Sequence, residues 1–182
     1  MDRKDYASLA EKVKASFLAG FYMEDKGYLK DVLSGTKSDE QIRCNQIWAV
    51  SMPFTMLSPE QEKSVVETVR RHLYTPCGLR TLSPEDPEYR GHYGGPMLDR
   101  DLAYHQGTVW VFPMGAYYLA YLKTHGGAKQ AGAYVRAQLE ALEQECLDLL
   151  AVLEDPVKVK ALLDGLPSPE TALPDDRRAI DA

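Results

Sequence analysis

Apolar residues recur at spacings of three and four along several stretches of the chain, which is the pattern of amphipathic helices. The first stretch predicts a helix over residues 6–21, with Leu9, Val13 and Phe17 on its apolar face. Gly27 then interrupts the pattern. The short apolar strings around it suit a turn or a brief strand pair over residues 25–35.

A second helix is predicted over residues 45–57, although Pro53 must kink it or end its first half, because proline lacks an amide hydrogen. A strong start signal follows. Ser58 is suited to cap a third helix, Pro59 to occupy its first position, and Gln61 to complete a capping box. The buried stripe predicted for this helix consists of Val65, Val66, Val69 and Leu73.

The second half of the chain predicts three more helices. Residues 109–123 are apolar almost all round, which implies burial on several sides. Residues 128–153 form a long amphipathic pattern, and residues 157–163 a short one. The stripe of the long helix consists of Leu139, Leu142, Cys146, Leu149 and Val152. We therefore expect an all-α domain of helical hairpins over residues 1–165 and an extended or disordered tail over 166–182.

Composition narrows the class of protein further. The chain has 182 residues, 45% of them hydrophobic and 26% charged, which fits one globular domain. Its net charge is −6 and its basic residues are scattered, so nucleic acid is not an expected partner. The sequence shows no signal segment and no window long enough to cross a bilayer. We expect a cytoplasmic chain without a membrane partner.

The three cysteines, Cys44, Cys77 and Cys146, are odd in number and far apart. This spacing argues against a disulfide framework and does not match a metal-binding pattern. We expect all three to be reduced, partly buried side chains, with Cys77 the most exposed. No metal and no cofactor is predicted.

Candidate chemistry concentrates in the polar loop over residues 75–101 and in the heptapeptide 104–110, Tyr-His-Gln-Gly-Thr-Val-Trp. Aromatic side chains cover the faces of sugars, and amide, imidazole and guanidinium groups bind hydroxyls. Tyr89 and Tyr93, separated by Gly91, are suited to line a pocket with aromatic surface. These segments predict the rim of a pocket for a hydroxyl-rich ligand.

Four segments, taken in order, resemble the amylo-α-1,6-glucosidase domain of glycogen debranching enzymes. They are Arg-Cys-Asn-Gln at 43–46, Gly-Leu-Arg-Thr-Leu-Ser-Pro at 78–84, Tyr-Arg-Gly-His-Tyr-Gly-Gly at 89–95, and Arg-Asp followed by the heptapeptide at 100–110. The resemblance covers about residues 6–123. It implies an (α/α)6 toroid of paired helices, here partial or shortened, that hydrolyses α-1,6-linked glucose in α-glucans.

The residues that we expect to bind substrate lie in these segments: Asn45, Gln46, Arg80, Tyr89, Tyr93, Asp101, Tyr104, His105, Gln106 and Trp110. Simpler roles remain open for some of them. Asn45 is equally suited to be an N-cap, and His105 with Gln106 to cap the helix predicted over 109–123. Arg80 either contacts a ligand or pins the loop by pairing with Asp86 or Asp101, and we favour the pinning role.

Two departures from the family concern catalysis. The family's acid is an Asp upstream of the matched residues, and its second carboxylate is a Glu in a downstream segment that residues 160–165 faintly resemble, with Ala161 in place of that Glu. Glycoside hydrolysis ordinarily needs two carboxyl groups on opposite sides of the bond. The nearby carboxylates, Asp86, Glu88, Asp99 and Asp101, are explained at least as well by turns and loop pairing. The catalytic residues are therefore unknown.

The sequence thus predicts a fragment or shortened homologue of the glucosidase that binds an α-glucan and is inactive alone. It has about half the helices of a closed six-hairpin ring, which leaves an apolar flank. We expect a second copy of the chain or the remainder of a larger debranching protein to cover that flank. The alternative is a non-catalytic helical domain that binds carbohydrate or forms an oligomer.

Overall fold

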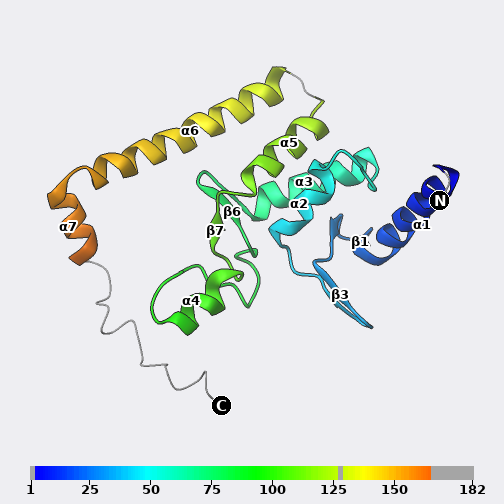
Figure 1. Cartoon of the computed structure of the whole chain (residues 1–182), viewed down its shortest axis with the longest axis horizontal. Helices are drawn as coiled ribbons and strands as arrows, with labels where there is room; N and C mark the ends of the chain where they lie inside the picture. Colours follow the sequence, from blue (N-terminus) through cyan, green and yellow to red (C-terminus); the bar gives the residue numbers. More distant parts are fainter. Residues whose placement is uncertain (1–2, 127–128, 165–182) are drawn as a thin grey trace, which may run out of the picture.

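A computed structural model describes residues 3–126 and 129–164, and these residues are mostly helical (Figure 1), which confirms the helical class. The helices are α1 (Arg3–Phe21), the 3₁₀ turn η1 (Cys44–Gln46), α2 (Ile47–Ser51), α3 (Pro59–His72), α4 (Met97–Tyr104), α5 (Met114–Thr124), α6 (Lys129–Leu153) and α7 (Pro156–Asp164). Short strands connect them: β1 (Tyr22–Met23), β2 (Tyr28–Leu29), β3 (Val32–Ser34), β4 (Lys37–Asp39), β5 (Tyr74–Thr75), β6 (Gly78–Arg80) and β7 (Val109–Trp110).

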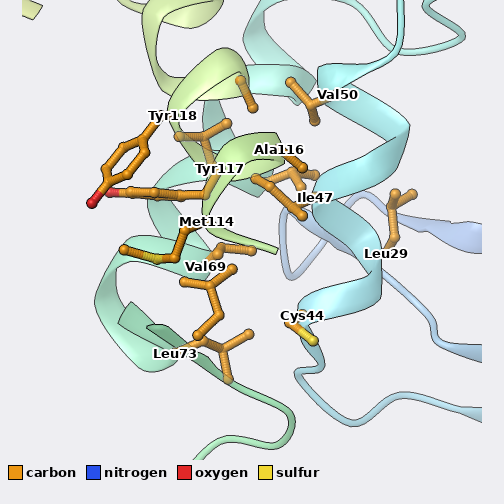
Figure 2. Close-up of a cluster of buried hydrophobic side chains, with 14 of the residues drawn as sticks. Leu29, Cys44, Ile47, Val50, Val69, Leu73, Met114, Ala116, Tyr117 and Tyr118 are labelled. Atoms are coloured by element: carbon orange, nitrogen blue, oxygen red, sulfur yellow. The ribbon is translucent and has the colours of Figure 1, made fainter. Parts of the chain in front are cut away.

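The hydrophobic core lies between α2, α3 and α5, which pack against one another at the centre of the molecule (Figures 1 and 2). Ile47 and Val50 of α2, Val69 of α3 and Tyr117 of α5 are fully buried. Each such aliphatic or aromatic side chain contributes roughly 1.5–3 kcal/mol through burial. This three-helix core is the rigid body to which the polar loops are attached.

Helix α3 begins where the sequence predicts. The hydroxyl of Ser58 accepts from the amide of Gln61 at 3.2 Å, and the side-chain oxygen of Gln61 accepts from the amide of Ser58 at 2.9 Å. The capping box is therefore confirmed. The predicted stripe is confirmed as well, since Val65, Val66, Val69 and Leu73 are all fully buried.

The structure contains two small hairpins after α1, and helix α2 is shorter than the helix predicted over residues 45–57. β1 pairs with β2 and β3 with β4, so the region predicted as a turn or strand pair contains parts of two small hairpins. Helix α2 ends at Ser51, and Met52 is extended with ψ of 149°. Pro53 follows directly and has no amide hydrogen to continue the helix. The prediction that Pro53 ends the helical segment early is confirmed.

The predictions for the polar loop over 75–101 and for the helix over 109–123 are wrong in detail. The loop over 75–101 contains β6 and the start of α4, and Val109–Trp110 forms β7 in place of the first turn of a helix. In the three-stranded sheet β5-β6-β7, Leu79 pairs with Trp110 and is fully buried. These long-range ladder bonds override the local helical pattern, and α5 begins only at Met114, after Pro113.

Helices α6 and α7 match their predicted ranges closely, but the predicted stripe of α6 is mostly exposed, and only Leu142 and Val152 of it are partly buried. The buried residues of α6, Ala131 and Val135, lie in its first two turns, near α5. Farther along, Leu139 and Leu149 are about half exposed and Cys146 is exposed, because α6 continues past the body of the molecule (Figure 1). The predicted tail over 166–182 lies outside the described residues. Within residues 3–126 and 129–164, no helix has the length and hydropathy to span a membrane.

Candidate functional site

The segment between β6 and α4, together with the end of α4, surrounds an open cleft of about 730 Å³. The cleft is lined by Pro87, Glu88, Tyr89, Arg90, Asp101, Leu102 and Gln106. Three of the predicted binding residues, Tyr89, Asp101 and Gln106, therefore lie at one site. Sequence reasoning missed Arg90 as a binding residue, and it weighed Glu88 only as a nearby carboxylate.

Gln106 is held in one orientation at the wall of the cleft. Its side-chain oxygen accepts from Nη2 of Arg43 at 2.7 Å, and its Nε2 donates to Oε2 of Glu88 at 3.3 Å. Its backbone carbonyl accepts from the amide of Arg90 at 2.5 Å. Because the oxygen is bound by a cation, the amide nitrogen is directed to Glu88 and the cleft.

Arg43 supplies this orientation from a largely buried position, with 13% of its side chain exposed. Its Nη1 donates to the carbonyl of His105 at 2.6 Å, and its Nε donates to Oε1 of Gln41 at 3.1 Å. Carboxylates of Asp31 and Asp39 lie 3.8 and 3.9 Å from Nε. The guanidinium therefore joins the chain before η1 to the end of α4. Arg43 belongs to the Arg-Cys-Asn-Gln motif, but the sequence analysis named only Asn45 and Gln46 of that motif as binding residues.

Gln41 and Asp86 hold the part of the 75–101 loop that carries Glu88 next to the cleft. Nε2 of Gln41 donates to Oδ1 of Asp86 at 3.1 Å and to Oε2 of Glu88 at 3.0 Å. Oδ1 of Asp86 also accepts from the backbone amide of Glu88 at 2.9 Å, which closes a local turn. Turn formation and loop pairing, the simpler reading of these two carboxylates, thus describe what they do in the structure.

Glycine is needed at position 107 because the chain approaches Tyr89 closely there. Gly107 has φ of 138°, and a Cβ at this position would meet the ring of Tyr89 at 2.5 Å and the carbonyl of Arg90 at 2.7 Å. The amide of Gly107 donates to the hydroxyl of Thr81 at 2.9 Å. The His-Gln-Gly sequence therefore lets Gln106 and Tyr89 lie at the same cleft.

The remaining aromatic residues form a separate cluster next to the cleft. The ring of Tyr104 lies 4.8 Å from that of Trp110, 6.0 Å from that of Tyr93 and 4.7 Å from that of His105. Nε1 of Trp110 donates to the carbonyl of Tyr104 at 3.3 Å. Tyr93 is 46% exposed and Tyr104 is 39% exposed. This cluster offers aromatic surface to solvent, but its rings are not among the residues that line the cleft.

Two of the simpler roles considered for these residues are wrong. His105 ends α4 as its C-cap and lies well before α5, so it does not cap a following helix. Asn45 lies inside η1, whose N-cap is Arg43, and its side-chain nitrogen donates to Oδ1 of Asp31 at 3.0 Å. Local capping rules misplaced both residues because the helix boundaries differ from the predicted ones.

Arg80 pins the loop through a different partner from those predicted. Its Nη1 donates to the carbonyl of Tyr74 at 3.3 Å and so ties β6 to the start of β5, while Asp86 is occupied by Gln41. The predicted pairing of Arg80 with Asp86 or Asp101 is wrong. The guanidinium therefore contacts the backbone of the neighbouring strand in the same sheet.

Gln46 lies apart from the cleft and has a structural role. It is 7% exposed, its Nε2 donates to the carbonyl of Arg43 at 3.0 Å, and its Oε1 accepts from the amide of Leu29 at 3.3 Å. With Asn45 it lines a second, smaller hollow of about 150 Å³ between η1 and the end of α1. The predicted residues therefore do not converge on one hollow.

The cleft is suited to bind hydroxyl groups. Glu88 and Asp101 supply acceptors, Arg90 supplies donors, and Tyr89 supplies a ring with a polar tip. Within the part of the chain that the structure describes, no group of three His, Cys, Asp or Glu side chains is placed to hold a metal ion.

These features define a mostly helical protein with an open, polar cleft beside an aromatic cluster. The chain belongs to the amylo-alpha-1,6-glucosidase family, whose pattern it matches over residues 1–157. It is also similar to the glycogen debranching enzyme of Saccharomyces cerevisiae, with 30% identity over 108 residues. That alignment covers 55% of this chain and 7% of the yeast enzyme, so the chain spans only a small part of the relative's length.

Proposed function

We propose that this chain binds α-glucans in the cleft, as the sugar-binding part of an amylo-α-1,6-glucosidase site in the cytoplasm. The observation that carries the proposal is the fixed side chain of Gln106, which lies in the cleft with Asp101 and Glu88. A pre-oriented amide next to the carboxylate of Glu88 binds a sugar hydroxyl with a smaller entropic cost of ordering the site. The aromatic cluster supplies a surface on which a sugar ring stacks.

The proposed role is binding without turnover by this chain alone. Hydrolysis of a glycosidic bond needs one protonated and one ionised carboxyl group across the bond. In the cleft, Glu88 is bound by Gln41 and Gln106, so its carboxylate is engaged in holding the loop. The acid and base are supplied by another segment or chain, which completes a helical toroid around the site.

A second candidate is a non-catalytic domain that associates with a second copy of the chain, and the exposed face of α6 favours it. Leu147, Leu150 and Leu153 are each more than half exposed on this 25-residue helix. Apolar surface of this kind is typical of an interaction site. The mass of the chain in solution distinguishes the two, because a purely monomeric species at micromolar concentration contradicts self-association through α6.

The first proposal is tested with the variant Asp101→Asn, which keeps the shape of the side chain and removes its charge. The matched control is Asp148→Asn on the exposed side of α6, away from the cleft. Calorimetric titration with panose, a linear trisaccharide with one α-1,6 linkage, measures affinity, and an assay of free glucose from a branched limit dextrin measures turnover. We expect saturable binding by the unmodified chain and the control, and no glucose release.

Asp101→Asn is expected to weaken panose binding roughly tenfold or more, because a hydrogen bond to a charged group contributes about 1.5–3 kcal/mol. Panose that does not bind at millimolar concentration contradicts the proposal. Equal affinity in Asp101→Asn and in the unmodified chain moves the site away from this cleft. Release of glucose by the chain alone contradicts the claim that the acid and base come from elsewhere.

A further inference from the structure

Two more hollows adjoin the cleft, and each shares one charged side chain with it. The first, called the hairpin hollow, has a volume of about 520 Å³ and is lined by Val32, Ser34, Lys37, Ser38, Asp39, Glu40, Gln41 and Glu88. The second, called the glycine hollow, has a volume of about 480 Å³ and is lined by Arg90, Gly91, His92, Gly94, Gly95, Asp99 and Ala103. The cleft is lined by both Glu88 and Arg90, so it is the middle member of the three.

Glu88 is held as a wall between the hairpin hollow and the cleft. Its Oε2 accepts from Nε2 of Gln41, which lines the hairpin hollow, at 3.0 Å. The same oxygen accepts from Nε2 of Gln106, which lines the cleft, at 3.3 Å. One amide therefore reaches the carboxylate from each side, and Oε1 stays available to accept from a ligand hydroxyl.

Arg90 occupies the matching position between the cleft and the glycine hollow. Its backbone amide is fixed by the carbonyl of Gln106, and its exposed guanidinium lines both hollows. Glu88 and Arg90 are two residues apart, so an acceptor and a donor follow one another along the same stretch of chain. A row of alternating acceptors and donors suits the repeated hydroxyl pairs of a sugar polymer.

The outer hollows carry the same kind of chemistry as the cleft. Lys37 and Ser34 give the hairpin hollow ammonium and hydroxyl donors, and His92 and Asp99 give the glycine hollow a donor and an acceptor. Each of the three volumes lies in the range of about 300–1,000 Å³ that is usual for ligand pockets. A single terminal glucose needs only one of them.

We infer that the three hollows form a row of subsites for consecutive sugars of an α-glucan chain, with Glu88 and Arg90 binding hydroxyls at the two junctions. The inference rests on the proposed function and extends it, because it makes chain length the determinant of affinity. Lys37 in the hairpin hollow and His92 in the glycine hollow are the residues that set specificity for longer glucans.

The test measures affinity against chain length, with glucose, maltose, maltotriose and maltohexaose titrated into the full chain by calorimetry. The variants are Lys37→Ala and His92→Ala, both at exposed positions. The matched control is Lys12→Ala, at an exposed position on α1. Thermal unfolding by circular dichroism verifies that each variant is folded.

In the unmodified chain and in Lys12→Ala, we expect maltohexaose to bind at least about tenfold more tightly than maltose, because each added hydrogen bond contributes about 0.5–1.5 kcal/mol. Lys37→Ala and His92→Ala are each expected to reduce that gain by about threefold or more. Their affinity for glucose, which a single hollow holds, stays within about twofold of the unmodified chain.

Three results separate the inference from the function on which it rests. Equal affinity for maltose and maltohexaose overturns the row of subsites and leaves binding in the cleft intact. A length-dependent gain that persists in both variants also overturns the row, since the outer hollows then contribute nothing. Absence of binding for every sugar overturns the proposed function itself.

Discussion

The substitution Arg43→Lys tests whether one guanidinium orients the cleft. Arg43 binds three acceptors in a fixed fork: the carbonyl of His105, Oε1 of Gln106 and Oε1 of Gln41. Lysine keeps the charge, but its single ammonium cannot satisfy acceptors that are spread over the width of a guanidinium. We expect two of the three acceptors to lose their charged donor.

The magnitude follows from those two bonds. Each hydrogen bond to a charged group contributes about 1.5–3 kcal/mol, so the loss of two is expected to lower the free energy of unfolding by about 3–6 kcal/mol. For a chain of this size, each 1 kcal/mol lowers the melting temperature by about 2–4 °C. The amide of Gln106 becomes free to rotate, and panose affinity is expected to fall as well, by about threefold or more.

Urea unfolding followed by circular dichroism measures the stability, and calorimetry measures the affinity. Arg71→Lys is the matched control, because Arg71 is exposed near the end of α3 and far from the cleft. That control is expected to change neither quantity measurably. If Arg43→Lys unfolds at the same urea concentration and binds panose as tightly as the unmodified chain, the guanidinium fork does not organise the site.

Two further predictions concern local features of the fold. Ser58→Ala removes the acceptor of the capping box and is expected to lower the free energy of unfolding by about 1 kcal/mol, whereas Ser58→Asp retains most of it in the same urea experiment. Burial raises the pKa of the Cys44 thiol to about 11 from an ordinary value of 9.0, so at pH 8 a thiol reagent is expected to modify the exposed Cys77 and Cys146 quickly and Cys44 only after unfolding. Because the unfolded thiol ionises first, this group's contribution to stability is lost as pH rises between about 9 and 11, and a Cys44→Ala variant lacks that part of the alkaline decline.

Features that depend on neighbours within one turn of helix were predictable from the sequence. The capping box at Ser58 needs only Gln61, three residues later, and the break after Ser51 needs only Pro53. The ranges of α6 and α7 follow from their own apolar spacing and from Pro156. The family was recognisable for the same reason, since its motifs are contiguous segments.

Features that depend on distant partners were not predictable. Val109 and Trp110 read as the start of an apolar helix, but hydrogen bonds to β6, some thirty residues earlier, hold them in a strand. Arg43 meets Gln106 across 63 residues of sequence, so no local rule shows that it orients the cleft. The exposure of Leu149 on α6 was not predictable either. An apolar stripe shows that a helix is suited to be buried, but whether another element covers it depends on the tertiary structure.

The sequence by itself determined where α3 begins, where α2 ends early and which ranges α6 and α7 span, as well as which family the chain resembles and which segments carry the polar groups. The tertiary structure alone decided which of those groups share a cleft: Gln106, Tyr89 and Asp101 do, and Gln46 does not. The physical reason is that helix caps and apolar periods are short-range interactions, whereas a binding site is made by hydrogen bonds and packing between residues far apart in the chain.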